Sequence, residues 1–151
     1  MLNITLITIG KIKEAYLNEA SLEYIKRIKP YGRLVIQELK AEPFSLTTKD
    51  KAKKIEGERI QAVLERKNGA EVYLLSEHGT LFKSPEFAAK IKDKELVLVI
   101  AGSLGFAKEL ESKYAKISLS PLTFPHELAR VVLLEQIYRA TTIINNKEYH
   151  Y

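Results

Sequence analysis

SLSPLTFPHELARVVLLEQIYRA, from Ser118 to Ala140, is the stretch of this chain whose residues impose most on its structure. It begins as the end of a β-strand, in which polar and apolar residues alternate. The strand stops at Pro121, because proline cannot donate a hydrogen bond to a ladder. A tight connection follows: Phe124 precedes a proline and is excluded from the helical region, Thr123 is a candidate helix cap, and Pro125 suits a first helical turn.

The residues after this connection predict a helix that is covered on both sides. Its apolar positions are too many for a single stripe: 128, 131, 132, 133, 134, 137 and 138. Charged and polar side chains within such a helix are normally paired or used in function, and here they are Arg130, Glu135, Gln136 and Arg139. Strand, kinked connection and buried helix together indicate the floor of a pocket.

The composition is that of one ordinary globular domain, residues 1–151, with 46% hydrophobic and 28% charged residues. The chain has no cysteine, which excludes disulfides, thiolate metal sites and a cysteine nucleophile, and favours a cytoplasmic location. The first residues, MLNITLITIGKIKE, lack a basic leader and alternate like a strand, so we expect no signal peptide. No apolar run reaches membrane-spanning length.

The charge balance favours anionic partners. Lys and Arg number 24 against 19 acidic residues, which gives a formal net charge of +5 and a pI of about 9.3. Nucleic acid is the first candidate for such a partner. The alternative is a solvated, lysine-rich surface with no partner, and the pI does not separate the two.

Strands and helices alternate along the chain. Apolar patterns predict strands at Leu2–Ile9, Leu34–Leu39, Val72–Leu75, Leu96–Ile100 and Ile117–Leu119. Helical spacing predicts helices over residues 12–28, 50–67, a short stretch from 84, 107–113 and the long helix described above. This alternation indicates an α/β fold with a mainly parallel sheet and helices on both faces.

Local signals refine this prediction. Thr47, with Asp50 three residues later, resembles a capping box, and His78-Gly79 reads as a turn. Parallel sheets bind ligands beyond the carboxyl ends of their strands, so the candidate loops follow Leu75, Ile100 and Leu119.

The glycine loop AGSLG, residues 101–105, lies between a buried strand and a helix. Small residues let a ligand approach the backbone there, but the same residues also serve a tight turn. The loop is neither GxGxxG nor a Walker loop. Ser103 also resembles a nucleophile elbow, with His126 or His150 as base. However, no acid stands in the expected order, so a serine hydrolase is disfavoured.

The remaining polar residues each have two interpretations. The histidines lack metal-ligand spacing, so we expect no metal. Arg130 and Arg139 either pair with Glu135, which stands four residues before Arg139, or hold phosphate or a substrate carbonyl. The tail Tyr149-His150-Tyr151 is either a frayed end or an aromatic lid that stacks on an unpaired base.

These motifs together resemble the RlmH family, small SPOUT-class methyltransferases that methylate N3 of a pseudouridine in large-subunit ribosomal RNA. The resemblance rests on Leu75 with a nearby Gly79, the strand-ending AGSLG, the block from Ser118 to Ala140 and a C-terminal Tyr-His, and it covers the whole chain. It implies an α/β sheet whose C-terminal segment threads a loop as a trefoil knot. It also implies a homodimer with the last helix in the interface, and 23S ribosomal RNA in the ribosome as partner.

The resemblance further implies where the methyl donor, S-adenosylmethionine, is held. The implied cofactor residues are Leu75, Ala101, Gly102, Leu119, Ser120, Pro121, Leu122, Thr123 and Phe124. Residues that could stabilise the uracil anion or relay its proton are Arg130, Arg139, His126 and His150. Candidate phosphate contacts are two basic groups, Lys26, Arg27, Lys29 and Arg33, and Lys51, Lys53 and Lys54.

The chain departs from the family pattern at two positions. Ala101 stands where the family has glycine, which requires a negative φ there, and Tyr151 stands where the family has a basic residue. A non-catalytic RNA-binding or assembly factor with the same fold is the main alternative to an enzyme.

Overall fold

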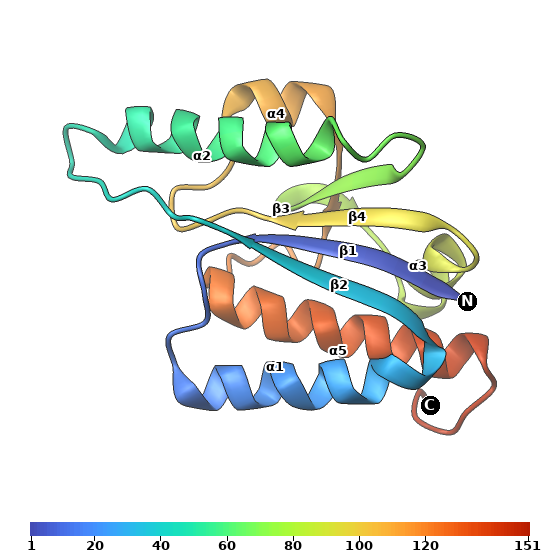
Figure 1. Ribbon diagram of the computed structural model, residues 1–151. Coiled ribbons are helices and arrows are strands. Elements are labelled where there is room, and N and C mark those ends of the chain that lie inside the picture. Colours follow the sequence, from blue (N-terminus) through green and yellow to red (C-terminus); the bar gives the residue numbers. More distant parts are fainter.

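One five-stranded sheet organises the molecule. The computed structural model describes all residues, 1–151 (Figure 1). The strand order is β2-β1-β4-β3-β5, and every neighbouring pair is parallel. The α/β prediction is therefore confirmed, with a sheet that is entirely rather than mainly parallel. The strands are β1 Leu2–Ile9, β2 Gly32–Leu39, β3 Glu71–Leu81, β4 Glu95–Ile100 and β5 Ala115–Ser118.

Helices cover both faces of this sheet, as the alternation predicts. Helices α2 and α4 lie on one face, and α1, α3 and α5 lie on the other (Figure 1). None of them combines the length and apolar composition needed to cross a membrane. Their bounds are α1 Ala15–Ile28, α2 Lys49–Leu64, α3 Ser84–Ile91, α4 Lys108–Lys113 and α5 His126–Ile144, with a 3₁₀ turn η1 at Lys29–Tyr31.

Strand β4 shows why the two layers form. It lies between β1 and β3, and its residues Leu96–Ile100 are all buried. Leu96, Leu98 and Ile100 join the core beneath α1, α3 and α5, while Val97 and Val99 join the core beneath α2 and α4. A strand buried on both faces needs an unbroken apolar run, which is what the sequence has here.

Strand β3 is longer than predicted, because His78-Gly79 is not a turn. The strand continues to Leu81, and both Leu75 and Thr80 are aligned with Ile117 of β5, so residues 76–79 form an irregularity in the ladder. A Cβ placed on Gly79 would lie 2.5 Å from the carbonyl carbon of Ile117. At Gly79, β3 therefore approaches the backbone of β5 at a separation that only glycine permits.

Two helix starts also differ from the predictions. The capping box predicted for Thr47 and Asp50 does not form: helix α2 follows Thr48, which makes no side-chain cap, and the Thr47 hydroxyl contacts Ser45 Oγ at 3.0 Å. Helix α5 follows Pro125, so Thr123 is not its cap. The Thr123 hydroxyl instead donates to the carboxylate of Glu77. The trefoil knot stays a prediction.

We expect Gly79→Ala to lower the free energy of unfolding by about 2–4 kcal/mol, because the new methyl group must push β3 away from the backbone of β5. Urea unfolding followed by circular dichroism measures this. Gly69→Ala is the control: φ is +84° there, but nothing lies within 4 Å of the added Cβ. It should cost about 1 kcal/mol. Equal losses for the two variants would contradict the close approach.

Candidate functional site

A cavity of about 670 Å³ opens at the carboxyl edge of the sheet. This volume is in the range of small-molecule and cofactor sites. Three chain segments form its wall: residues 75–78 of β3, the loop after β4, and the connection between β5 and α5. Parallel strands bring all three to one edge, although they are far apart in the sequence. The lining residues are Lys53, Leu75, Ser76, Glu77, His78, Ile100, Ala101, Gly102, Ser103, Gly105, Phe106, Glu111, Leu119, Ser120, Leu122, Thr123, Phe124, Pro125, His126 and Ala129.

The cavity gathers nearly all of the residues that the sequence nominates for cofactor binding. Of those residues, only Pro121 does not line it. The predicted loops after Leu75, Ile100 and Leu119 thus surround one space, and cofactor binding by their residues stays a prediction.

The glycine loop, residues 101–105, lines the cavity with backbone and small side chains. Gly105 has a φ of +78°, and its N–H donates to the Gly102 carbonyl at 3.1 Å, which closes a tight turn. A Cβ on Gly102 would lie 3.1 Å from both Glu56 Oε1 and Ile9 Cγ2, so this position is packed from behind. Ala101 is not among the non-glycine residues with positive φ, so its methyl group is compatible with the backbone there.

The connection between β5 and α5 is held by its own hydroxyl groups. Ser118 Oγ donates to the Ser120 carbonyl at 2.8 Å, and the Leu122 N–H donates to Ser120 Oγ at 3.0 Å. Thr123 ties the far end of the connection to Glu77 of β3. These contacts order the connection before any ligand binds, which lowers the entropic cost of binding.

The charged residues around the cavity include several that the sequence did not nominate for it. Glu77 and His78 enter because β3 continues past Leu75, and Glu77 Oε1 lies 3.4 Å from His78 Nε2. Glu77 and His78 are missed from the sequence alone, because His78-Gly79 is interpreted there as a turn that follows the strand. Lys53, which the sequence offered only as a phosphate contact, reaches the cavity from α2.

Arg130 lies close to the cavity but does not line it. Its guanidinium Nη1 donates to Glu38 Oε2 at 2.8 Å and contacts Thr8 Oγ1 at 3.4 Å, and the side chain is buried. Pairing of Arg130 with Glu135 was therefore wrong. Glu135 follows Arg130 by five residues, about one and a half turns, so it lies on a different side of α5. Glu38 of β2 is the carboxylate that faces Arg130 instead. Arg130 joins α5 to the ends of β1 and β2.

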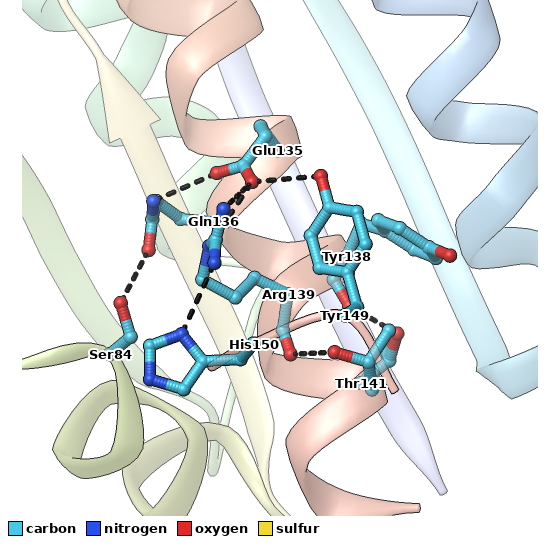
Figure 2. Close-up of polar contacts among 9 residues, drawn as sticks. Ser84, Glu135, Gln136, Tyr138, Arg139, Thr141, Tyr149 and His150 are labelled. Atoms are coloured by element: carbon cyan, nitrogen blue, oxygen red, sulfur yellow. Dashed lines mark hydrogen bonds and ion pairs between the residues drawn. The ribbon is translucent and has the colours of Figure 1, made fainter. Parts of the chain in front are cut away.

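Arg139 belongs to a separate polar cluster on the second half of α5, shown in Figure 2. Its Nε and Nη2 donate to Glu135 Oε1 at 3.1 and 2.6 Å, which confirms the predicted pair. Tyr149 donates to the same oxygen at 3.0 Å, and its ring packs edge-on to Tyr138. The tail is thus folded back on α5 and does not fray. The Glu135 hydrogen bond raises the pKa of Arg139, which stays charged.

His150 completes this cluster, with its Nδ1 3.1 Å from Arg139 Nη1. A guanidinium has no acceptor, so Nδ1 must accept and the ring proton must be on Nε2. The cluster lies far from the cavity of its own chain: His126 lines the cavity, and Arg139 comes thirteen residues later in the same helix, about 20 Å along it.

Comparison with known proteins settles the family. Residues 2–150 match the family described as predicted SPOUT methyltransferase. The chain is 41% identical to the ribosomal RNA large subunit methyltransferase H of Carboxydothermus hydrogenoformans, over 99% of both chains. It is also 41% identical to the protein of that name from Clostridium acetobutylicum, again over 99% of both chains. The chain belongs to the SPOUT methyltransferases, in the RlmH family.

Solved structures agree on the fold. A chain described as giving insights into 2-OH methylation of C/U34 on tRNA superposes with a TM-score of 0.53 at 14% identity, covering 97% of this chain and 99% of that one. Ser103 and His126 both line the cavity, but no hydrogen bond joins Ser103 to His126 or His150. The serine hydrolase alternative therefore lacks the contact between nucleophile and base that it needs. No group of three or more metal-ligating side chains gathers in the protein.

The SPOUT chain should show one late tyrosine titration. Burial, with the hydrogen bond to Glu135 second, raises the pKa of Tyr149 from 10.0 to about 12. A raised folded-state pKa means that its stabilising contribution is complete below pH 10 and is lost as the pH rises from 10 towards 12. Ultraviolet titration of tyrosinate should lose this late step in Tyr149→Phe. In Glu135→Gln the pKa should fall only part of the way, because burial remains. A late step that persists in Tyr149→Phe would refute the assignment.

Proposed function

We propose that this SPOUT methyltransferase transfers a methyl group from S-adenosylmethionine to N3 of a pseudouridine, the 1915 site, in 23S ribosomal RNA of the assembled ribosome. The observation that carries the proposal is the single cavity enclosed by the three loops of the RlmH motifs. The printed names of relatives at 41% identity support the ribosomal RNA substrate. Such a substrate places the protein in the cytoplasm, and residues 1–151 act as one catalytic domain.

The residues around the cavity fit S-adenosylmethionine. Gly102 leaves its backbone open to a ligand, and Leu75 and Phe124 supply apolar surface for an adenine. The Glu77 carboxylate adds negative charge that suits a cation. When bound there, the cofactor supplies a methyl group on a positively charged sulfur. The nine residues nominated from the sequence, Pro121 included, are the proposed binding set.

The site requires two copies of the chain. Arg139 and His150 lie about 20 Å from the cavity of their own protomer, too far to act there. The outer surface of the α1–α5 layer also exposes apolar side chains, namely Tyr16, Leu22 and Leu128. Of the apolar positions that predict a covered α5, only Leu128 is exposed within one chain. A homodimer through this layer covers that surface and brings the Arg139 cluster of one protomer to the cavity of the other.

The four candidate catalytic residues then have different tasks. The uracil N–H must lose its proton, and the resulting anion needs positive charge or hydrogen-bond donors. Arg139 supplies a fixed cation, and His150 presents an Nε2–H donor, because its Nδ1 already accepts from Arg139. His126, on the cavity wall, is the proposed proton acceptor. Arg130 is engaged by Glu38 and positions α5.

The main test is methyl transfer from labelled S-adenosylmethionine to ribosomes that lack the modification, followed by mapping of the labelled base. We expect label at N3 of one pseudouridine. Gly102→Val should weaken cofactor binding by about tenfold or more, because a Cβ there would lie 3.1 Å from Glu56 and Ile9, and the larger side chain must displace the cavity loop. Calorimetry measures this, with Gly69→Ala as a remote glycine control. No cofactor binding by the wild-type chain would favour the non-catalytic RNA-binding alternative.

Mixed dimers test the shared site. Gly102→Val damages the cavity and Arg139→Ala damages the cluster, so each homodimer should be nearly inactive. A mixture contains heterodimers with one intact cavity facing one intact cluster, and roughly a quarter of wild-type activity should return. Sedimentation should show that both variants remain dimeric. Absence of recovery in verified heterodimers would show that cavity and cluster act within one chain or not together.

A further inference from the structure

The connection between β2 and α2 projects beyond the carboxyl edge of the sheet, on the left in Figure 1. At its tip, Phe44 is 49% exposed and Leu46 is 89% exposed. Neither joins a hydrophobic core. We call residues 40–54, which include the connection and the start of α2, the docking arm. Apolar side chains held out in solvent on a loop are a feature of interaction surfaces.

The beginning of the docking arm, residues 40–42, which we call its root, is fixed to α2. Glu56 Oε2 accepts a hydrogen bond from the Glu42 N–H at 3.0 Å. Arg59 donates to the Lys40 carbonyl at 2.9 Å and forms an ion pair with Glu42 at 2.6 Å. Glu56 is buried and lies against Gly102 of the cavity loop. The root is therefore braced by the same helix that supports the cavity.

The tip is ordered by its own polar groups. Ser45 N–H donates to Thr48 Oγ1 at 2.9 Å, and Thr48 N–H donates back to the Ser45 carbonyl at 3.1 Å. Ser45 Oγ also contacts Thr47 Oγ1 at 3.0 Å. These hydrogen bonds pair polar groups of the loop with one another, while the side chains of Phe44 and Leu46 stay exposed. A preordered loop loses less entropy when a partner binds.

The charge of the docking arm is strongly positive. It carries five lysines, Lys40, Lys49, Lys51, Lys53 and Lys54, against two acids, Glu42 and Asp50. Arg59 neutralises Glu42, and none of these lysines forms an ion pair. Free lysines beside an exposed aromatic ring are the combination that binds single-stranded nucleic acid, through phosphates and base stacking.

The docking arm also adjoins the cavity. Lys53 lines the cavity and stands about 7 Å along α2 from Thr48 at the end of the tip turn. A strand of RNA whose target base enters the cavity would pass its flanking nucleotides over this surface. A protein partner would not need so many unpaired lysines.

We propose that the docking arm binds unpaired RNA next to the target nucleotide, with Lys51 and Lys54 on phosphates and Phe44 stacked on a neighbouring base. This inference rests on the proposed function for the identity of the partner as RNA. It assigns a role to Phe44 and the 40–48 loop, which the cavity and the Arg139 cluster leave unexplained.

Equilibrium binding to large ribosomal subunits lacking the modification tests the proposal. Phe44→Ala should weaken binding about tenfold, the usual effect of removing one stacking ring, and Phe44→Trp should restore it. Lys51→Gln/Lys54→Gln should lower the slope of log affinity against log salt by roughly 1 to 2. The matched control, Arg66→Gln/Lys67→Gln, removes two cations beyond the other end of α2 and should change the slope by less than half as much. Affinity for S-adenosylmethionine should be unchanged in all four variants.

The outcomes separate this inference from the proposed function. A photo-reactive amino acid at position 44 should crosslink to ribosomal RNA. Crosslinks confined to ribosomal protein, or binding that Phe44→Ala does not change, would refute RNA binding by the docking arm. Methyl transfer by the wild type would still support the proposed enzymatic function. If the wild type transferred no methyl group but the Phe44 and lysine variants still weakened binding, the proposed enzymatic function would be refuted. RNA binding by the docking arm would then still be supported.

Discussion

The second half of β3 touches β5 so closely that a β-carbon at Gly79 would come within 2.5 Å of the Ile117 backbone. This contact sets much of the geometry of the site. It carries Glu77 to the β5–α5 connection, where Thr123 bonds to its carboxylate, and it places Glu77 and His78 on the cavity wall. A wider spacing would separate the loop after Leu75 from the loop after Ser118. The cavity would then lose one of its three walls.

Helix α5 uses two arginines differently because their surroundings differ. Arg130 is buried beneath the sheet, where a carboxylate on β2 and a hydroxyl on β1 meet its guanidinium. Breaking such a pair would leave a charge in the core, so the contact constrains where α5 lies. Arg139 is at the far end, held by a local carboxylate and covered by the tail (Figure 2). One end of the helix thus serves the cavity, and the other carries the polar cluster that a dimer would deliver to a partner.

Helix α2 serves two neighbouring structures at once. Gly57 allows it to approach Ala107, since an added Cβ would lie 2.9 Å from the Ala107 Cβ. Glu56, one residue earlier, is buried between Gly102 and the Glu42 amide, and its Oε1 has no hydrogen-bond partner. Cavity loop and docking arm therefore share a rigid support. Packing of this kind transmits displacement, because protein interiors have little free volume.

Local pattern alone determined the α/β class, the order of the elements and the three loops that carry the RlmH motifs. Periodicity reports which face of an element is buried, and parallel strands must end at a common edge. The Glu135–Arg139 pair was also predictable, since both residues belong to one helix turn. The motif block from Ser118 to Ala140 pointed to the family that the comparisons confirm.

Only the tertiary structure decided the rest. The continuation of β3 through His78-Gly79 depends on its pairing with β5, which lies some forty residues away and overrides the turn preference of that dipeptide. The partner of Arg130 is ninety-two residues distant on β2, and no local rule nominates it. Thr47 and Thr123 do not cap the helices predicted to follow them, because their hydroxyls bond to Ser45 and Glu77 instead. Sequence patterns record the burial and the local spacing of a residue, whereas these contacts arise between segments that meet only once the sheet has formed.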